Sequence, residues 1–132
     1  MNDFLNEITA QFEQAKGFEN KYMLLLKLAK SGEFLENEQC IDENEVAGCE
    51  AKVWLTWTEK NGKVQFLANS DSRLIKAILW IIVNVYNHKN ASQALDCVSI
   101  LQDLGLGNVV SQSRQNGILK IQQKIEQIIQ SQ

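Results

Sequence analysis

One cysteine in this sequence stands among neighbours that suggest chemistry. Cys49 lies within EVAGCEAKVW, residues 45–54, where it follows Gly48 and comes just before a segment that reads as a strand. Gly48 leaves no side chain beside the sulfur, so another backbone or an active-site loop can approach closely. A residue at the point where a loop enters a strand can present its side chain while the sheet holds its base still. Cys49 is therefore a candidate nucleophile, a candidate metal ligand or a packing residue.

The charges around Cys49 oppose one another. Glu45 and Glu50 favour the protonated thiol, whereas Lys52 favours the thiolate. A thiol attacks only as its thiolate, so a reactive Cys49 needs a further positive group or a helix N-terminus. Arg114 is the best distant candidate for that group. The residues by themselves leave open whether Cys49 is a reactive thiol or a buried packing cysteine.

The three cysteines, Cys40, Cys49 and Cys97, are an odd number at wide spacing. This spacing does not suit a disulfide framework and predicts reduced thiols. The sequence contains no C-x-x-C pair of the kind that marks zinc sites. The thiols could still converge in space, so an iron–sulfur or zinc scaffold built on all three remains an alternative. Cys97 is expected in the core, and Cys40, in an acidic stretch, has no predicted function.

Other catalytic groupings find little support. His88 is the only histidine and lies in YNHKN, at the polar end of a predicted helix, so a Cys–His pair would depend on it alone. The stretch LGLGN contains two glycines but lacks the lysine of a phosphate-binding loop. We therefore expect neither a nucleophilic triad nor a nucleotide site.

Length and composition indicate one domain over residues 1–132. Hydrophobic residues make up 45% and charged residues 22% of the chain, an ordinary globular balance. The net charge of -3 and the lack of a long basic block argue against nucleic acid as a partner. The most apolar stretch, 77–83, is far shorter than the roughly 20 residues that cross a bilayer, and the N-terminus lacks a secretory pattern. We expect a soluble, cytoplasmic protein with no membrane partner.

The periodicity of apolar residues predicts the elements that hold Cys49. Alternating apolar positions over 51–58 and 64–68, joined by Asn61-Gly62, are typical of an antiparallel hairpin with a tight turn. Spacings of three and four residues predict helices over about 3–17, 18–30, 72–86, 91–104 and from 113 onwards.

The helix expected over 72–86 is apolar nearly all round, so it belongs in the centre of the domain, and Ser70 or Asp71 can cap it. The acidic stretch 33–48 reads as a long loop with room for one short strand. Two or three strands are marginal by themselves, so helices must cover one face of the sheet. The predicted fold class is α+β: a small antiparallel sheet of two to three strands packed against helices.

Several stretches together resemble the SufE family of sulfur-acceptor proteins, which includes the CsdE branch. VAGCEAKVW, ANSDSRLIKAI and SQSRQNGI follow one another in that family's order, and FENKYMLLLKLA is similar to its N-terminal helix pattern. The likeness runs from about residue 18 to residue 125. Glu50-Ala51 replaces the common Gln-Ser after the cysteine, and a glutamate there is more like the CsdE branch. Asn69 and Ala77 also depart from the family pattern, which bears on the choice of partner.

The resemblance implies a SufE/IscU-like fold and a pyridoxal-phosphate cysteine desulfurase, SufS-like or CsdA-like, as partner. It implies that Cys49 accepts persulfide sulfur from that desulfurase, and it maps the aspartate and arginine of the family's motifs to Asp71 and Arg114, with Gly48 giving access. It also implies an activator rather than an enzyme, with no tightly bound cofactor, since the pyridoxal phosphate belongs to the partner. The sulfur would pass to iron–sulfur cluster assembly or another downstream acceptor.

Overall fold

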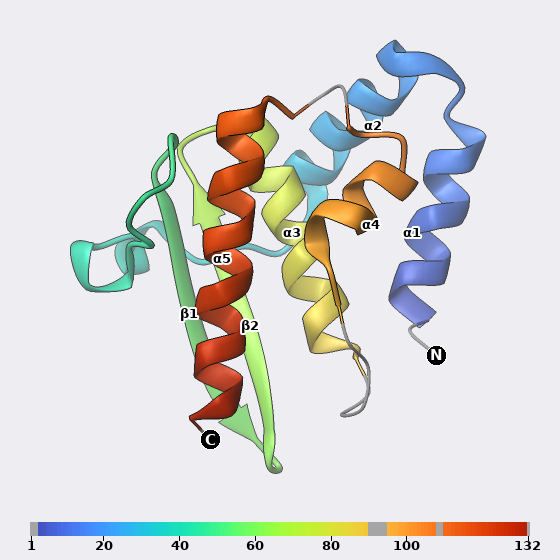
Figure 1. Ribbon diagram of the computed structural model, residues 1–132. Coiled ribbons are helices and arrows are strands. Elements are labelled where there is room, and N and C mark those ends of the chain that lie inside the picture. Colours follow the sequence, from blue (N-terminus) through green and yellow to red (C-terminus); the bar gives the residue numbers. More distant parts are fainter. Residues whose placement is uncertain (1–2, 90–94, 108–109, 132) are drawn as a thin grey trace.

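The computed structural model describes residues 3–89, 95–107 and 110–131. The described residues form five α-helices and one antiparallel hairpin (Figure 1). The helices are α1 (Asp3–Gln14), α2 (Gly17–Ser31), α3 (Arg73–Asn87), α4 (Cys97–Asp103) and α5 (Gln112–Gln130). The strands are β1 (Val53–Lys60) and β2 (Lys63–Ser70), preceded by the 3-10 turns η1 (Asn37–Gln39) and η2 (Asp42–Asn44). The expected α+β fold with a small antiparallel sheet is confirmed.

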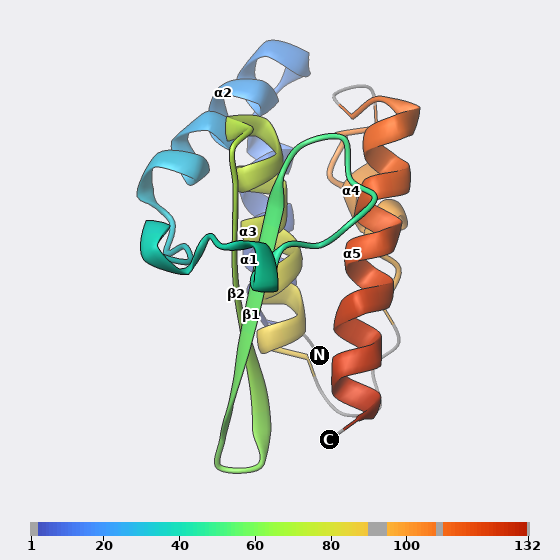
Figure 2. The same ribbon diagram turned by 90° about the vertical axis from the view of Figure 1, so that its left-hand side faces the viewer.

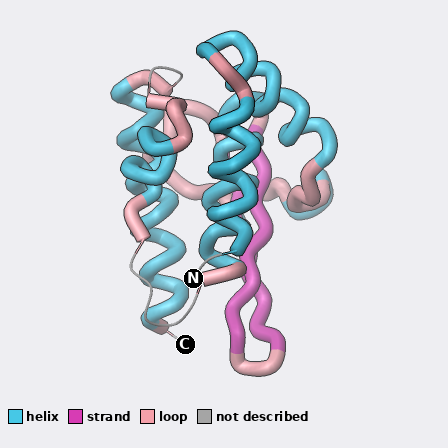
Figure 3. The backbone as a smooth tube through the Cα atoms, turned by 90° about the vertical axis from the view of Figure 1, so that its right-hand side faces the viewer, coloured by secondary structure: helices cyan, strands magenta, loops and turns pink. Residues whose placement is uncertain are grey.

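The hairpin forms as its turn residues predict. Asn61 and Gly62 have φ angles of 54° and 77°, the two left-handed positions that a tight two-residue turn requires. The expected alternation holds for Val53 and Leu55, which are buried, whereas Trp57 is 40% exposed. Trp57 lies in the half of β1 nearer the turn, and this end of the hairpin extends beyond the helices (Figure 3).

α3 fills the centre of the molecule, as its apolar pattern predicts. It lies behind the hairpin in the view of Figure 2, and it packs against β2, α2 and α1. Its side chains Ile78, Leu79 and Ile81 are completely buried. The helix is therefore the central element against which β2, α2 and α1 pack.

The cap of α3 differs from the expectation. Ser72 caps the helix, since its Oγ accepts a hydrogen bond from the backbone N–H of Ile75 at 3.3 Å. Ser70 Oγ instead donates to the carbonyl of Lys52 at 2.7 Å. Asp71 Oδ1 accepts from the N–H of Lys52 at 3.1 Å. The two predicted caps are thus wrong by one or two residues, because both side chains bind the residue that precedes β1.

Part of the acidic loop runs along the outer edge of β1. The N–H of Val46 donates to the carbonyl of Val53 at 2.8 Å, next to a single β-bridge between Glu45 and Trp54. The sequence left room for a short strand here, and the described loop contains this one bridge and the two 3-10 turns instead.

The outer edge of β2 is covered by two different segments. The N–H of Leu35, in the loop after α2, donates to the carbonyl of Ala68 at 3.0 Å. The side-chain amide of Asn87, at the end of α3, accepts from the N–H of Phe66 at 2.8 Å and donates to its carbonyl at 3.0 Å. Three outward backbone groups of this edge strand, the N–H and carbonyl of Phe66 and the carbonyl of Ala68, are therefore bonded within the molecule.

The fourth helix is shorter than expected. A helix was predicted over about 91–104, of which residues 90–94 lie outside the described part of the chain. Leu95 and Asp96 are not helical, and α4 begins only at Cys97. Asp96 acts as the cap, with Oδ1 accepting from the backbone N–H of Ser99 at 3.2 Å. No helix in the described residues is both long and apolar enough to cross a membrane.

Candidate functional site

The loop that precedes β1 carries Cys49 to the side of α5 (Figure 2). Cys49 is half-buried, and its thiol makes a weak hydrogen bond to the carbonyl oxygen of Gly117 at 3.7 Å. A Cβ on Gly117 would lie 3.6 Å from both Cα and Cβ of Cys49 and 3.7 Å from Sγ. A Cβ at Gly117 would thus be in ordinary van der Waals contact with Cys49, because the loop packs directly on the helix.

A lysine lies over the glycine beside the thiol. A Cβ on Gly48 would be 2.8 Å from Cδ of Lys120 and 3.1 Å from its Cε. Gly48 also has a φ angle of +88°, a conformation that residues with a side chain rarely adopt. Gly48 is therefore required both by its backbone conformation and by the close approach of Lys120.

Burial raises the pKa of the Cys49 thiol above its ordinary value, the Lys120 ammonium lowers this pKa, and the Glu45 carboxylate raises it again. The net direction is upward, so Cys49 rests mainly as a thiol at neutral pH. The expectation that Lys52 supplies the nearby positive charge is not met, because the cation that acts on the thiol is Lys120. Arg114 lines a small pocket together with Cys49.

Sequence reasoning missed Lys120. The one signal for it is its spacing: Lys120 follows Gly117 by three residues, so both lie on the same face of α5. Arg114 precedes Gly117 by three residues and lies on that face as well. Once Gly117 is known to touch Cys49, the helical repeat brings both cations toward the loop.

Cys49 lines both a small pocket and an open groove. The pocket has a volume of about 10 Å³, room for a single water molecule at most, and it is lined by apolar residues that include Val53, Ile118 and Ile121. The groove has a volume of about 620 Å³. It is lined by Gly48, Cys49, Glu50, Ser113, Asn116, Leu119, Lys120 and Gln123. A reactant can therefore approach the thiol from the groove, while packed side chains lie on the other side.

Asp71 does not belong to the lining of that groove. Its carboxylate accepts from the N–H of Lys52 at 3.1 Å, and its own N–H donates to the carbonyl of Lys52 at 3.3 Å. Lys52 is three residues after Cys49 in the chain. The structure thus gives Asp71 a positioning role, in which it fixes the end of the Cys49 loop to the end of β2.

The other two cysteines lie in different surroundings. Cys97 is 1% exposed, and burial is the main cause that raises its pKa to about 12. Cys40 donates to the carbonyl of Glu36 at 3.5 Å, and burial raises its pKa as well. Among the described residues, which include all three cysteines, no three Cys, His, Asp or Glu side chains are grouped to hold a metal ion. The geometry gives the scaffold alternative no support.

Known proteins resemble this chain over most of its length. Residues 6–129 match the SufE family, described as an Fe-S metabolism associated domain. The sulfur acceptor protein CsdE of Escherichia coli is 32% identical over 111 residues, which are 82% of this chain and 76% of that protein. An uncharacterised SufE-like protein of Rhizobium etli is 30% identical over 129 residues, 93% of this chain and 87% of the relative.

A third relative, an uncharacterised SufE-like protein of Haemophilus influenzae, is 29% identical over 121 residues, covering 89% of this chain and 96% of that protein. The matched region contains the Cys49 loop, the hairpin and nearly all of α5. Because the family model covers almost the whole chain, the chain belongs to the SufE family.

Proposed function

We propose that Cys49 accepts persulfide sulfur from a cysteine desulfurase, and that this protein thereby acts as a sulfur carrier. The observation that carries the proposal is the placement of Cys49 at an open groove, next to a glycine and a lysine. Family membership and the sulfur-acceptor role named for the E. coli relative support it.

The transfer is a thiol–persulfide exchange. The Cys49 thiolate attacks the outer sulfur of a persulfide on the desulfurase, and a new S–S bond forms at Cys49. The S–S bond on the desulfurase breaks, and its cysteine leaves as a thiolate. That thiolate takes up the proton that Cys49 released, so a thiol and a persulfide have exchanged places without any outside oxidant.

Each neighbour of Cys49 has a part in this step. Gly48 leaves room for Lys120 to lie close to the Cys49 loop, and Lys120 stabilises the attacking thiolate. The Gly117 carbonyl orients the resting thiol from the side of the helix. Arg114, at the edge of the pocket, is a second cation for the negatively charged persulfide.

The raised pKa of Cys49 gives the free carrier a further property. Because burial favours the protonated form, the thiol reacts slowly with oxidants and other thiols until a partner docks. Docking brings the partner's persulfide to the groove, and the thiolate that leaves when its S–S bond breaks takes up the proton of Cys49.

The pyridoxal phosphate that removes sulfur from L-cysteine belongs to the desulfurase in this proposal, whether that enzyme is SufS-like or CsdA-like. The carrier clears the persulfide and so raises turnover without completing a reaction itself. The sulfur then passes to iron–sulfur cluster assembly, in keeping with the family's description, or to another acceptor.

A set of single cysteine variants tests the proposal. The unaltered protein, Cys40→Ser, Cys49→Ser and Cys97→Ala are each mixed with the desulfurase and L-cysteine, and intact mass spectrometry detects added sulfur. We expect the adduct to disappear in Cys49→Ser only. Circular dichroism shows that each variant is folded. An adduct that survives in Cys49→Ser would contradict the proposal.

A further inference from the structure

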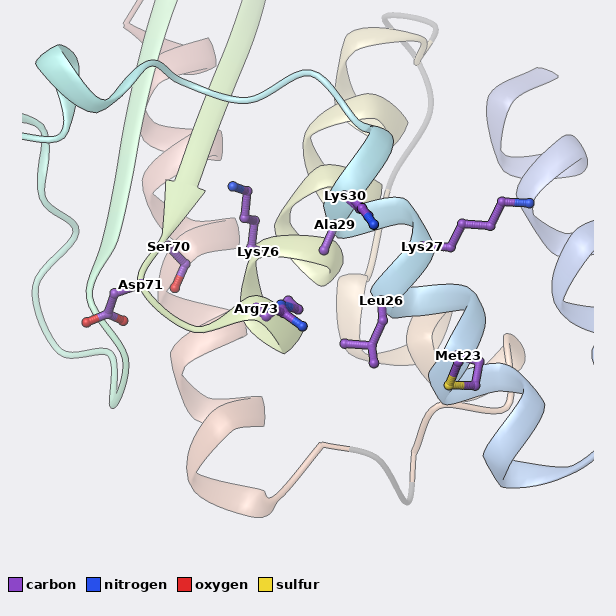
Figure 4. A pocket seen from close by; sticks show the side chains of 9 residues that line it. All are labelled: Met23, Leu26, Lys27, Ala29, Lys30, Ser70, Asp71, Arg73 and Lys76. Carbon is purple, nitrogen blue, oxygen red and sulfur yellow. The ribbon is translucent and has the colours of Figure 1, made fainter.

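A second groove lies between α2 and the start of α3, away from the lining of the Cys49 groove (Figure 4). We call it the basic groove and define it by Met23, Lys27, Lys30, Asp71, Arg73 and Lys76. Its volume is about 590 Å³. Met23, Lys27 and Lys30 follow one another at helical spacing along one face of α2, while Arg73 and Lys76 stand on the first turn of α3.

The charge of this groove is opposite to that of the protein. Four cationic side chains and one carboxylate line it, although the whole chain carries a net charge of -3. The carboxylate, Asp71, already accepts from the backbone of Lys52. Lys76 lies over the ring of Phe34, 4.5 Å from its centroid. Within the described residues, the side chains of Lys27 and Arg73 are exposed and make no ion pair.

The chemistry of the lining favours a protein segment over a small anion. Ser70, the buried polar residue of the groove, uses its Oγ for Lys52 and Ser72. A small anion would therefore meet only side-chain cations, of which Lys27, Lys30 and Arg73 are exposed. The two most exposed large apolar side chains among the described residues are Phe18, at 59%, and Met23, at 57%, and both lie on α2. Exposed aromatic and methionine side chains are typical of protein interfaces.

The basic groove is joined to the Cys49 loop by a short path. Asp71, at its edge, binds the N–H of Lys52 at 3.1 Å, and Lys52 is three residues from Cys49. The basic groove and the Cys49 loop are therefore connected through Asp71 and the backbone of Lys52.

We propose that the basic groove docks an acidic segment of the cysteine desulfurase, with Met23 as an apolar contact at its end. This inference rests on the proposed function for the identity of the partner. The attraction between the four cations and a run of carboxylates speeds encounter and fixes the orientation in which Cys49 faces the persulfide. The interaction is screened by salt, since three of the four cations are exposed.

A pair of charge reversals with a matched control tests the groove. Lys27→Glu/Lys30→Glu reverses two groove cations, and Lys60→Glu/Lys63→Glu makes the same change in net charge at the hairpin turn. All four residues are exposed, so both proteins are expected to fold, which circular dichroism checks. With the desulfurase of the same organism, the rate of Cys49 persulfide formation is measured against carrier concentration.

We expect the groove pair to raise the carrier concentration for half-maximal transfer about tenfold at low salt, with the saturated rate changed less than about twofold. The hairpin control should change either quantity less than about twofold. The difference in half-maximal concentration between the groove pair and this control should disappear near about 0.5 M salt. Arg73→Gln, on the opposite wall, should act in the same direction by about threefold. Equal behaviour of the groove pair and the hairpin control would overturn the inference.

Calorimetric binding of Cys49→Ser carriers to the desulfurase separates this inference from the proposed function. If the groove pair binds more weakly than the hairpin control while the protein with Cys49 gains no sulfur, the groove is supported and the carrier chemistry is refuted. Sulfur transfer to Cys49 with equal binding of the groove pair and its control would refute the groove and sustain the carrier.

Discussion

Cys49 and Cys97 place the same functional group in two different surroundings. Cys97 begins α4 within the core, where its backbone N–H donates to the side chain of Gln122 at 2.8 Å. Cys49 lies in a loop against α5, half-buried, with an open groove on one side. Burial raises the pKa of both thiols, and it raises that of Cys97 to about 12.

The difference shows that exposure and one nearby charge set how readily each of the two thiols can react. Lys120 opposes the effect of burial at Cys49 and lowers its pKa. At Cys97 the carboxylate of Asp96 adds to the effect of burial and raises the pKa further. The core thiol is thus held protonated and enclosed, whereas the loop thiol can become a thiolate where a partner can meet it.

Alkylation of the native protein should separate the two thiols most widely. We expect Cys49 to react with iodoacetamide at least about a hundredfold faster than Cys97, because Cys97 becomes accessible only through local unfolding. Peptide mapping of a time course measures both rates in one sample. The rates should converge in denaturant, and a native Cys97 that reacts as fast as Cys49 would contradict its placement in the core.

The pH dependence of stability should come more from Cys97 than from Cys49. An unfolded thiol loses its proton near pH 9.0, while folded Cys97, with a pKa of about 12, keeps it. The contribution is complete below pH 9.0 and is lost as the pH rises toward about 12, by up to about 1.4 kcal/mol per pH unit. Urea unfolding at rising pH should give a steeper fall for the unaltered protein than for Cys97→Ala. Cys49→Ala should keep most of the slope, and identical slopes in the two variants would refute the assignment.

A matched pair of glycine variants should show what Gly48 gives to the reactive thiol. Gly48→Ala and Gly62→Ala both place a side chain at positive φ, and each should lower the free energy of unfolding by about 1 kcal/mol. Only at Gly48 would the new Cβ meet another side chain, Lys120, whereas nothing lies within 4 Å at Gly62. Alkylation of Cys49 should therefore slow about fivefold in Gly48→Ala only. Equal slowing in both variants would mean that loss of stability, rather than displacement of Lys120, controls the rate.

Removal of the lysine charge should have the smallest effect. Lys120→Gln is expected to raise the pKa of Cys49 and to slow its alkylation at neutral pH about threefold, since one exposed charge acts through solvent. Lys124→Gln, one turn further along α5, removes the same charge and should leave the rate unchanged. The pH profile of alkylation measures the shift, and a profile unaltered in Lys120→Gln would exclude this lysine from the site.

The elements of the fold follow from local patterns, and the errors follow from competition between neighbouring polar residues. The local sequence alone predicts the hairpin, from Asn61-Gly62, and the central helix, from the apolar residues of α3. The α3 cap was misplaced because Ser70 and Asp71 bind Lys52, which is 18 or more residues away in the chain. No local pattern reveals such a preference, since it depends on where β1 begins.

The residues of the site also fall into two groups, those that the local sequence indicates and those that only the packing brings to Cys49. Gly48 and Cys49 could be singled out from adjacent residues, because their chemistry is local. Gly117 and Lys120 belong to a helix that meets the loop across 68 positions of sequence, between Cys49 and Gly117. Only the packing of that helix decides which of its faces, and so which cation, stands beside the sulfur.

The amide of Asn87 has a consequence for how this molecule meets others. It occupies both backbone groups of Phe66, and Leu35 occupies the carbonyl of Ala68, on what is otherwise the free side of a two-stranded sheet. A strand from a second molecule would need those same groups to extend the sheet. The Asn87 side chain and the loop at Leu35 thus block the backbone pairing by which a second strand would extend the sheet at this edge.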